Sequence, residues 1–454
     1  MGNHSDFPFS AYIKDGKKVI AYNGNKILDR VDDLTELEVR PHSFEVYYDK
    51  DAFSDYFGFR GKSLLRGDVS PRRYWTSILN IYSVIFESIA EYFAKKKVKY
   101  VPPTAITKLA LYESLISLRS KRGQQIKYFP YLTVEWFPEV NQKYDVQLTE
   151  SEQVYLEMSL ALTDSNQVYT IGNAFRRQRS DWFSLPEFHQ VEYEAKLDDR
   201  YVKSGKALEF VKKELLDLLG KVVNDLMDKA WDDLSQFVDE DYLDTIQKAV
   251  KNPKTITLKE ALKALRDTKH PDYEDQNKVL EVGLGLWEKI YISTKEDTSS
   301  KEDTLLFLEG MPYERAPLYL TYKGSEEKVA DVASLLWPGY VDIAVLGHRA
   351  RSPDEILDRI ESFLLQWFEE RSSSQEKEKK EEQLQDKEKQ PLEESLKEYY
   401  RPYISIRGKL HEGYMYRETV GFGLGLERLV QALLRLPRIT DATLFPRTHG
   451  HLSV

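Results

Sequence analysis

Apolar residues recur in two different rhythms along this 454-residue chain, and the change between them separates helix-rich from strand-rich stretches. From 72 to 96, directly after Pro71, an apolar residue returns every three or four positions, which predicts a long amphipathic helix. The same spacing predicts a helix over 150–162, a helix-rich stretch over 206–266 and a helix over 353–369.

Alternation of apolar and polar residues predicts the strands. Residues 168–178 and 187–196 alternate on either side of a polar loop, which is typical of a β-hairpin. Strand patterns dominate again over 304–350, which includes PLYLTYK at 317–323, and over 400–425. Because strands and helices are grouped rather than regularly alternating, a doubly wound parallel sheet is not expected. We therefore predict an α+β fold, in which helices flank an antiparallel β-sheet.

Composition indicates how the chain is organised. Residues 1–70 hold short alternating runs separated by Gly, Asn and Asp, and we expect a small N-terminal β-rich segment there. Residues 71–454 would form the main domain. Within it we expect a helical insertion at about 200–300 and a charged, low-complexity insertion at about 370–395, where apolar residues nearly vanish.

Charge and cysteine content exclude several classes of protein. The net charge of −10 argues against an indiscriminate polyanion binder, although a local basic patch could still hold a nucleotide or RNA. The absence of cysteine excludes disulfides, thiol nucleophiles and Cys-ligated metal sites, and it favours a cytoplasmic location. No stretch of 18 apolar residues occurs, so no transmembrane helix is expected.

The predicted hairpin carries the first chemical signal. Strand alternation places Arg176 and Gln178 on one face of its first strand, and Gln190, Glu192 and Glu194 on one face of its second. A fixed arginine beside acidic groups could bind a phosphate and an ammonium together. An exposed hairpin with surface salt bridges has the same pattern, and spacing alone leaves both interpretations open.

The second signal is GFGLGLERL at 421–429, in which three glycines alternate with apolar residues before Glu427 and Arg428. Taken alone, it fits either a nucleotide-binding loop or a strand that runs into a helix. A dinucleotide-binding fingerprint would need a βαβ setting, which the order of predicted elements does not provide.

These motifs together resemble the signatures of class II aminoacyl-tRNA synthetases. FRRQ followed by PEF is similar to the second signature, and GFGLGLERL followed by FPR is similar to the highly specific third signature. FESIAEYF at 86–93, with Pro103 downstream, resembles the weaker first signature. The resemblance extends from about 72 to 447 and implies the antiparallel core of that class.

Finer features resemble the aspartyl/asparaginyl subgroup. LTESEQVYLE, MPYERAPLYL and SLLWPGYVDIAVLGHR are similar to three of its conserved elements. Leu156 stands where aspartyl enzymes carry lysine, and Glu192 stands where they carry aspartate. The chain is therefore most similar to asparaginyl-tRNA synthetases or to their asparagine-synthetase-like paralogs.

The resemblance implies a role for each motif residue. Arg176 would contact the ATP α-phosphate and Arg428 would stack on adenine, which makes these two the catalytic arginines. An amino-acid site would consist of Gln153 and Glu192, which hold the ammonium, and Arg349 at the side-chain end. The ATP site would contain Arg176, Gln178, Phe188, Asp342, Gly421, Gly423, Gly425 and Arg428, with Mg²⁺ held by Asp342 and Ser334.

Several positions depart from the family pattern. Gln178 replaces a glutamate, Ser334 replaces the aspartate expected to share Mg²⁺, and Asp342 is shorter than the expected glutamate. One fewer carboxylate should weaken the binding of MgATP. Residues 1–70 are also too few for the full OB-fold that reads the anticodon in this subgroup.

The resemblance implies amino-acid activation through an aminoacyl-adenylate, with ATP and Mg²⁺ as cofactors. Three alternatives remain open: an asparaginyl-tRNA synthetase, a tRNA-independent asparagine synthetase that amidates aspartate with ammonia, and a non-catalytic nucleotide-binding paralog. Asn or Asp and ATP are the expected partners, with tRNA in the first alternative. A homodimer and no membrane association are also implied.

Overall fold

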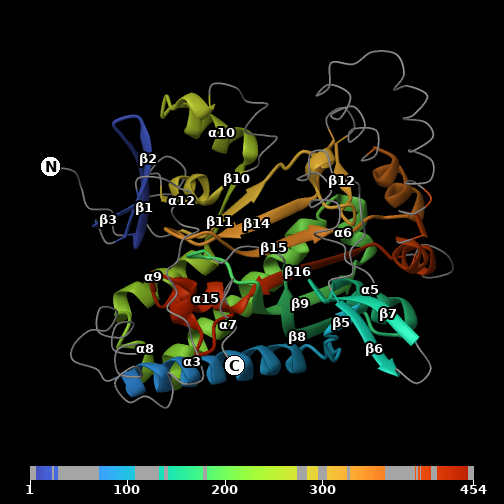
Figure 1. Ribbon diagram of the computed structural model, residues 1–454, viewed down its shortest axis with the longest axis horizontal. Helices are drawn as coiled ribbons and strands as arrows, with labels where there is room; N and C mark the ends of the chain where they lie inside the picture. The colour runs from blue at the N-terminus through green and yellow to red at the C-terminus, as the bar shows by residue number, and fades with distance from the viewer. Residues whose placement is uncertain are drawn as a thin grey trace.

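A computed structural model describes residues 7–22, 25–28, 71–107, 132–137, 142–176, 181–273, 284–294, 304–324, 328–362, 394, 397–398, 400–410 and 417–447. Its centre is an eight-stranded sheet, in the order β10-β11-β14-β15-β16-β9-β8-β4 (Figure 1). In that order the strands are Lys254–Thr257, Leu306–Glu309, Val332–Leu336, Asp342–His348, Thr419–Gly425, Glu187–Lys196, Gln167–Phe175 and Lys99–Tyr100.

The predicted fold class is confirmed. The six strands from β11 to β8 pair antiparallel throughout, and helices pack against the sheet. The predicted hairpin is β8 and β9, which pair antiparallel from Gln167↔Ala195 to Phe175↔Glu187. The two edge pairs, β10 with β11 and β4 with β8, are parallel.

Two long helices cover one face of the sheet. The helix predicted after Pro71 is α3 (Pro71–Lys95), and it packs on α7 (Ala207–Lys229), which in turn contacts β15 and β16. Phe93 of α3 stacks on Tyr169 and Tyr193, with ring centroids 4.2 and 5.7 Å apart, and Tyr193 stacks on Phe422 at 5.3 Å. Aromatic side chains from three strands and a helix therefore fill the space on this face.

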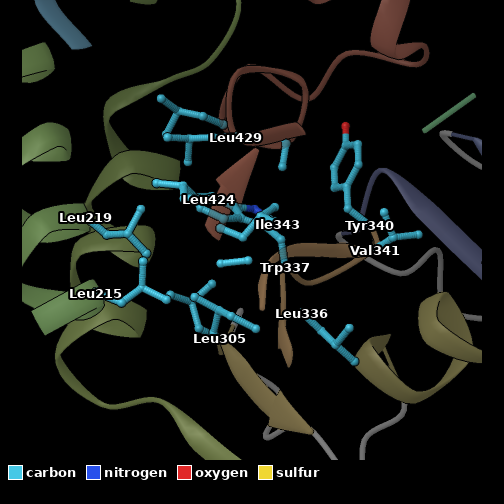
Figure 2. Close-up of a cluster of buried hydrophobic side chains, with 14 of the residues drawn as sticks. Leu215, Leu219, Leu305, Leu336, Trp337, Tyr340, Val341, Ile343, Leu424 and Leu429 are labelled. Atoms are coloured by element: carbon cyan, nitrogen blue, oxygen red, sulfur yellow. The ribbon is translucent and has the colours of Figure 1, made fainter. Parts of the chain in front are cut away.

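Figure 2 shows how the core continues toward the C-terminal helix. Leu215 and Leu219 of α7 face Leu424 of β16 and Leu429 of α15 (Leu426–Leu433), and all four are buried. Ile343 of β15 lies among them in the figure. This packing fixes the position of the glycine run and of the helix that follows it, because both ends are held in the same core.

The remaining elements are shorter. The helical ones include α5 (Gln153–Leu162), α6 (Asp199–Ser204), α8 (Trp231–Leu234), α9 (Glu240–Lys251), α10 (Leu258–Arg266), α12 (Leu286–Thr294) and 3₁₀ turns η3 (Pro271–Tyr273), η4 (Tyr313–Arg315) and η5 (Ile439–Ala442). Residues 353–362 and 400–410 are also helical, so the strand pattern expected over 400–425 is wrong for its first part and holds only for β16. The strands are β5 (Ile106–Thr107), β6 (Leu132–Phe137) and β7 (Gln142–Leu148), which form one sheet, and the pair β12 (Tyr322–Lys323) and β13 (Val329–Ala330).

The N-terminal strands pack directly on the main domain. β1 (Phe9–Lys14), β2 (Lys17–Tyr22) and β3 (Asn25–Leu28) form a small antiparallel sheet beside α12 (Figure 1). Phe9 is fully buried, with its ring centroid 5.1 Å from that of Phe183 and 5.3 Å from that of Tyr340. The N-terminal segment therefore shares the core of the domain.

Another expected strand was wrong, and one expected insertion lies mostly outside the described residues. PLYLTYK was expected to be a strand, but only Tyr322 and Lys323 belong to one, and Leu320 makes an isolated bridge with Arg349. The Leu320 amide donates to the Pro317 carbonyl at 3.1 Å, so the chain turns at the start of this stretch. Most of the charged insertion at about 370–395 lies outside the described residues. In the described part of the chain, no helix has the length and apolarity needed to cross a membrane.

Candidate active site

The sheet register brings residues from five strands into one row. Ser334 pairs with Val345, Val345 with Gly423, Gly423 with Glu192, and Glu192 with Thr170. Directly paired residues place their side chains on the same face of a sheet. The row therefore lies opposite the face that α3 and α7 cover, and its members other than Thr170 line a cavity.

A β-bulge directs Asp342 toward the same cavity. Leu335 pairs with Ala344, but Leu336 pairs with Asp342, so Ile343 is skipped. An extra residue of this kind re-aims the side chains beside it. Both Asp342 and Ser334 line the cavity as a result.

The cavity has a volume of about 280 Å³ and collects ten of the twelve predicted site residues. Gln178 lies outside the described residues, and Gly421 does not line the cavity. The residues that do are Gln153, Arg176, Phe188, Glu192, Ser334, Asp342, Arg349, Gly423, Gly425 and Arg428.

Arg428 is held by hydrogen bonds along the edge of its guanidinium. Nε donates to the Phe183 carbonyl at 2.8 Å, and Nη1 donates to the Asp342 carbonyl at 2.8 Å and to Asp342 Oδ2 at 3.0 Å. All these bonds lie near the guanidinium plane, so they fix the group while leaving its faces for a planar ligand. On another wall of the cavity, the guanidinium carbon of Arg176 lies 5.1 Å from the centroid of the Phe188 ring.

Asp342 is engaged by two cations. Its Oδ2 accepts from Arg428, and its Oδ1 pairs with Lys289 Nζ of α12 in a short contact. Although burial acts in the opposite direction, Lys289 and Arg428 lower the pKa of Asp342 to about 2.

A magnesium site at Asp342 and Ser334 is therefore not supported by the donors present. Both carboxylate oxygens already have cationic partners, and Ser334 offers only a hydroxyl. Among the residues that the structure describes, no group of three or more His, Cys, Asp or Glu could hold a metal ion. Mg²⁺ prefers several carboxylate and phosphate oxygens, so these side chains do not fit a protein-bound Mg²⁺.

The opposite end of the cavity is acidic and buried. Glu192 accepts hydrogen bonds from Ser151 Oγ and from the Glu152 amide, each at 2.8 Å. Burial raises the pKa of Glu192, while these hydrogen bonds and the charge of Arg176 oppose the rise. Gln153 donates through Nε2 to Glu157 Oε1 at 2.8 Å, which leaves its amide oxygen as an acceptor. The carboxylate and this oxygen suit an ammonium group.

Arg349 is paired before any ligand arrives. Its Nε and Nη2 donate to Glu194 at 2.9 to 3.1 Å, and both side chains are buried. Nη1 makes no hydrogen bond within the described part of the chain, and Arg349 lines the cavity. Leu156, the residue used in the sequence comparison with aspartyl enzymes, is 1% exposed within an apolar cluster. At this end of the cavity Arg349 and Glu194 thus form an ion pair, and Nη1 of Arg349 can still donate to a ligand.

The three glycines of the run differ in what a side chain at each position would contact, and Gly421 makes room for an ion pair rather than for a nucleotide. A Cβ at Gly421 would lie 2.0 Å from Glu194 Oε2 and 2.7 Å from Arg349 Nη2, so this glycine makes room for the ion pair. A Cβ at Gly423 would meet Gln190 Nε2 at 2.2 Å. A Cβ at Gly425 would have nothing nearer than 3.8 Å, which leaves an open approach to the cavity there.

This geometry can be compared with known proteins. The family model described as tRNA synthetases class II (D, K and N) matches residues 72–449. The chain belongs to this class II synthetase family. Its central sheet, its hairpin and its glycine run are therefore those of a class II synthetase core.

Curated relatives that match this chain are asparagine–tRNA ligases. The asparagine–tRNA ligases of Syntrophobacter fumaroxidans and Ureaplasma parvum are 27% identical over 309 residues and 24% identical over 287 residues. These matches cover 67% and 63% of this chain, and 55% and 54% of the relatives. The chain thus spans about half the length of the curated relatives it matches.

Solved structures share the fold. Asparaginyl-tRNA synthetase from Pyrococcus horikoshii, complexed with asparaginyl-adenylate, superimposes with a TM-score of 0.60 at 20% identity, and covers 89% of this chain and 74% of its own. The Entamoeba histolytica enzyme, also with asparaginyl-adenylate, gives 0.57 at 19% identity, with 85% and 69% coverage. Both likenesses support the class II fold.

Three side-chain contacts at the site of this class II synthetase were not predicted from its sequence. Lys289 and Glu194 form the ion pairs described above, and Glu427 ties α15 to β9. Glu427 accepts from the His189 amide at 2.9 Å and lies 2.6 Å from His189 Nδ1, and this hydrogen bond raises the pKa of His189. The sequence contained a signal for Glu194, which shares a strand face with Glu192, and for Glu427, which directly precedes Arg428, but none for Lys289.

We expect Glu152→Gln to stabilise the protein at alkaline pH. Burial raises the pKa of Glu152 to about 7, and its Oε1 accepts from the Thr104 amide at 2.8 Å, a bond that glutamine can keep. A raised carboxyl pKa gives stability below the unfolded-state pKa and loses it as the pH rises through the folded-state value. The gain should be roughly 3 kcal/mol at pH 8 and below roughly 1 kcal/mol at pH 5. Denaturant unfolding at both pH values measures it, and an equal change at both would contradict the assignment.

Proposed function

We propose that this chain activates asparagine with ATP to form asparaginyl-adenylate. The observation that carries the proposal is the matched pair of Arg349 and Glu194 at one end of the cavity, with donors and acceptor 2.9 to 3.1 Å apart. A neutral carboxamide can accept from the free Nη1 of Arg349 without adding charge. A carboxylate from aspartate would add an uncompensated negative charge beside Glu194.

The other groups of the cavity support an asparagine bound with its carboxamide at Arg349. Glu192 and the Gln153 oxygen would bind the ammonium of the amino acid, and adenine would lie between Phe188 and Arg428. The α-carboxylate oxygen would then attack the α-phosphorus, the bond to the bridging oxygen would break, and pyrophosphate would leave. Arg176 would stabilise the charge that develops on the α-phosphate oxygens. Positioning and electrostatics can carry this reaction without a protein nucleophile.

Transfer of asparagine to tRNA is the second half of the proposal. It is supported by the names of the curated relatives, which are asparagine–tRNA ligases. A homodimer and a cytoplasmic location remain predictions.

Pyrophosphate exchange tests the proposal. With asparagine, the protein should exchange labelled pyrophosphate into ATP at least ten times faster than with aspartate. Adding tRNA should give charged tRNA, whereas ammonia should give no product. Exchange with aspartate and release of free asparagine would establish the amidating enzyme instead. No exchange with either amino acid, despite ATP binding, would contradict both enzymatic functions.

A further inference from the structure

Lys289 is fixed at the cavity by its neighbours in α12. Trp287 is fully buried, and its Nε1 donates to the Val19 carbonyl at 3.0 Å. Glu288 accepts from Lys18 at 2.8 Å and from the Tyr273 hydroxyl at 2.5 Å. The residues directly before Lys289 are therefore held by the N-terminal hairpin and by η3, and Lys289 itself points to Asp342 and lines the cavity.

The ammonium of Lys289 retains N–H donors that a ligand could accept from. An ammonium has three N–H donors, and in the described part of the chain only Asp342 accepts from this one. The side chain is 26% exposed, which is more than the 13% of Asp342. One proton is thus committed to Asp342, and two remain as donors for a ligand in the cavity that Lys289 lines.

The local charge balance favours an anion. Asp342 contributes one negative charge, while Lys289 and Arg428, which contact it directly, contribute two positive charges. The low pKa of Asp342, about 2, means that this carboxylate stays ionised at neutral pH, so these three side chains together carry one positive charge. A divalent cation at this place would be repelled, whereas a polyphosphate would be attracted.

We propose that Lys289 binds the β- and γ-phosphates of ATP and supplies at this place the positive charge that a protein-bound metal ion would otherwise supply. The inference rests on the proposed function, because it assumes that ATP is the nucleotide in the cavity. A fixed ammonium held by a carboxylate is already oriented, so the phosphates meet a preorganised cation. ATP should then bind without a metal held by the protein.

Nucleotide binding by the full chain tests this role. ATP and AMP are titrated by calorimetry, with EDTA or with Mg²⁺, into the wild type, Lys289→Gln, Lys289→Arg and Lys263→Gln. Lys263 is exposed on α10 and serves as the matched control. The wild type should bind ATP with EDTA within about threefold of its affinity with Mg²⁺.

The variants should separate polyphosphate from nucleoside binding. Lys289→Gln should weaken ATP binding at least tenfold and AMP binding less than twofold, while Lys289→Arg and Lys263→Gln should stay close to the wild type. Equal weakening of AMP and ATP in Lys289→Gln, or no ATP binding by the wild type in EDTA, would overturn the inference while leaving the proposed function intact. A wild type that binds neither nucleotide would overturn the proposed function and this inference together.

Discussion

Arg428→Ala is expected to weaken ATP binding about 100-fold, which corresponds to about 2.7 kcal/mol. The wild-type guanidinium is fixed along its edge by the Phe183 carbonyl and by Asp342, at 2.8 to 3.0 Å. A guanidinium fixed in this way can stack on adenine without losing further conformational entropy, and a desolvated contact of this type contributes about 2 kcal/mol or more. Equilibrium dialysis with labelled ATP measures the loss.

Arg428→Lys separates stacking from charge. Lysine keeps the positive charge but lacks the planar group, so we expect it to restore less than a tenth of the lost affinity. Arg401→Ala, an exposed arginine outside the cavity, should bind ATP as the wild type does. Unchanged ATP affinity in Arg428→Ala would show that the nucleotide lies elsewhere.

Glu194→Gln is expected to shift amino-acid selectivity toward aspartate and to destabilise the fold by about 3–5 kcal/mol. The substitution leaves Arg349 buried, at 6% exposure, without its carboxylate partner. The side chain of aspartate could then supply the missing negative charge. The ratio of kcat/KM for aspartate over asparagine, from pyrophosphate exchange, should rise at least tenfold.

A second buried carboxylate provides the control for stability. Asp233 in α8 is 8% exposed and pairs with Arg73 at 3.2 Å, outside the cavity. Asp233→Asn should lower the free energy of unfolding without changing the selectivity ratio. If both variants changed selectivity alike, the effect would come from loss of stability, and the role of the Arg349–Glu194 pair would be refuted.

Much of the fold and part of the site could be predicted because they depend on local pattern. The helix after Pro71 and the β8–β9 hairpin follow from apolar spacing, and both are confirmed. The signature residues Arg428 and Glu192 were placed in one site by resemblance. Both line the cavity, because β16, which leads directly into α15 and Arg428, pairs with β9, which carries Glu192.

What could not be predicted depends on contacts between distant segments. Lys289 and Asp342 are 53 residues apart and meet only because α12 is held against the N-terminal hairpin. The requirement for glycine at position 421 could be recognised only from the register of β16 with β9, which places Glu194 opposite Gly421. The magnesium prediction was drawn from a resemblance, which gave no sign of the two cations that pair with Asp342.

The most direct test of the central claim is the affinity of the protein for a non-hydrolysable sulfamoyl analogue of asparaginyl-adenylate, measured by calorimetry beside the aspartyl analogue. The account predicts that the asparaginyl analogue binds at least 100-fold more tightly than ATP, because one cavity holds both halves of the adenylate. It also predicts weaker binding of the aspartyl analogue, whose extra charge Glu194 opposes. Equal affinity for the two analogues, or no binding of the asparaginyl one, would contradict the account.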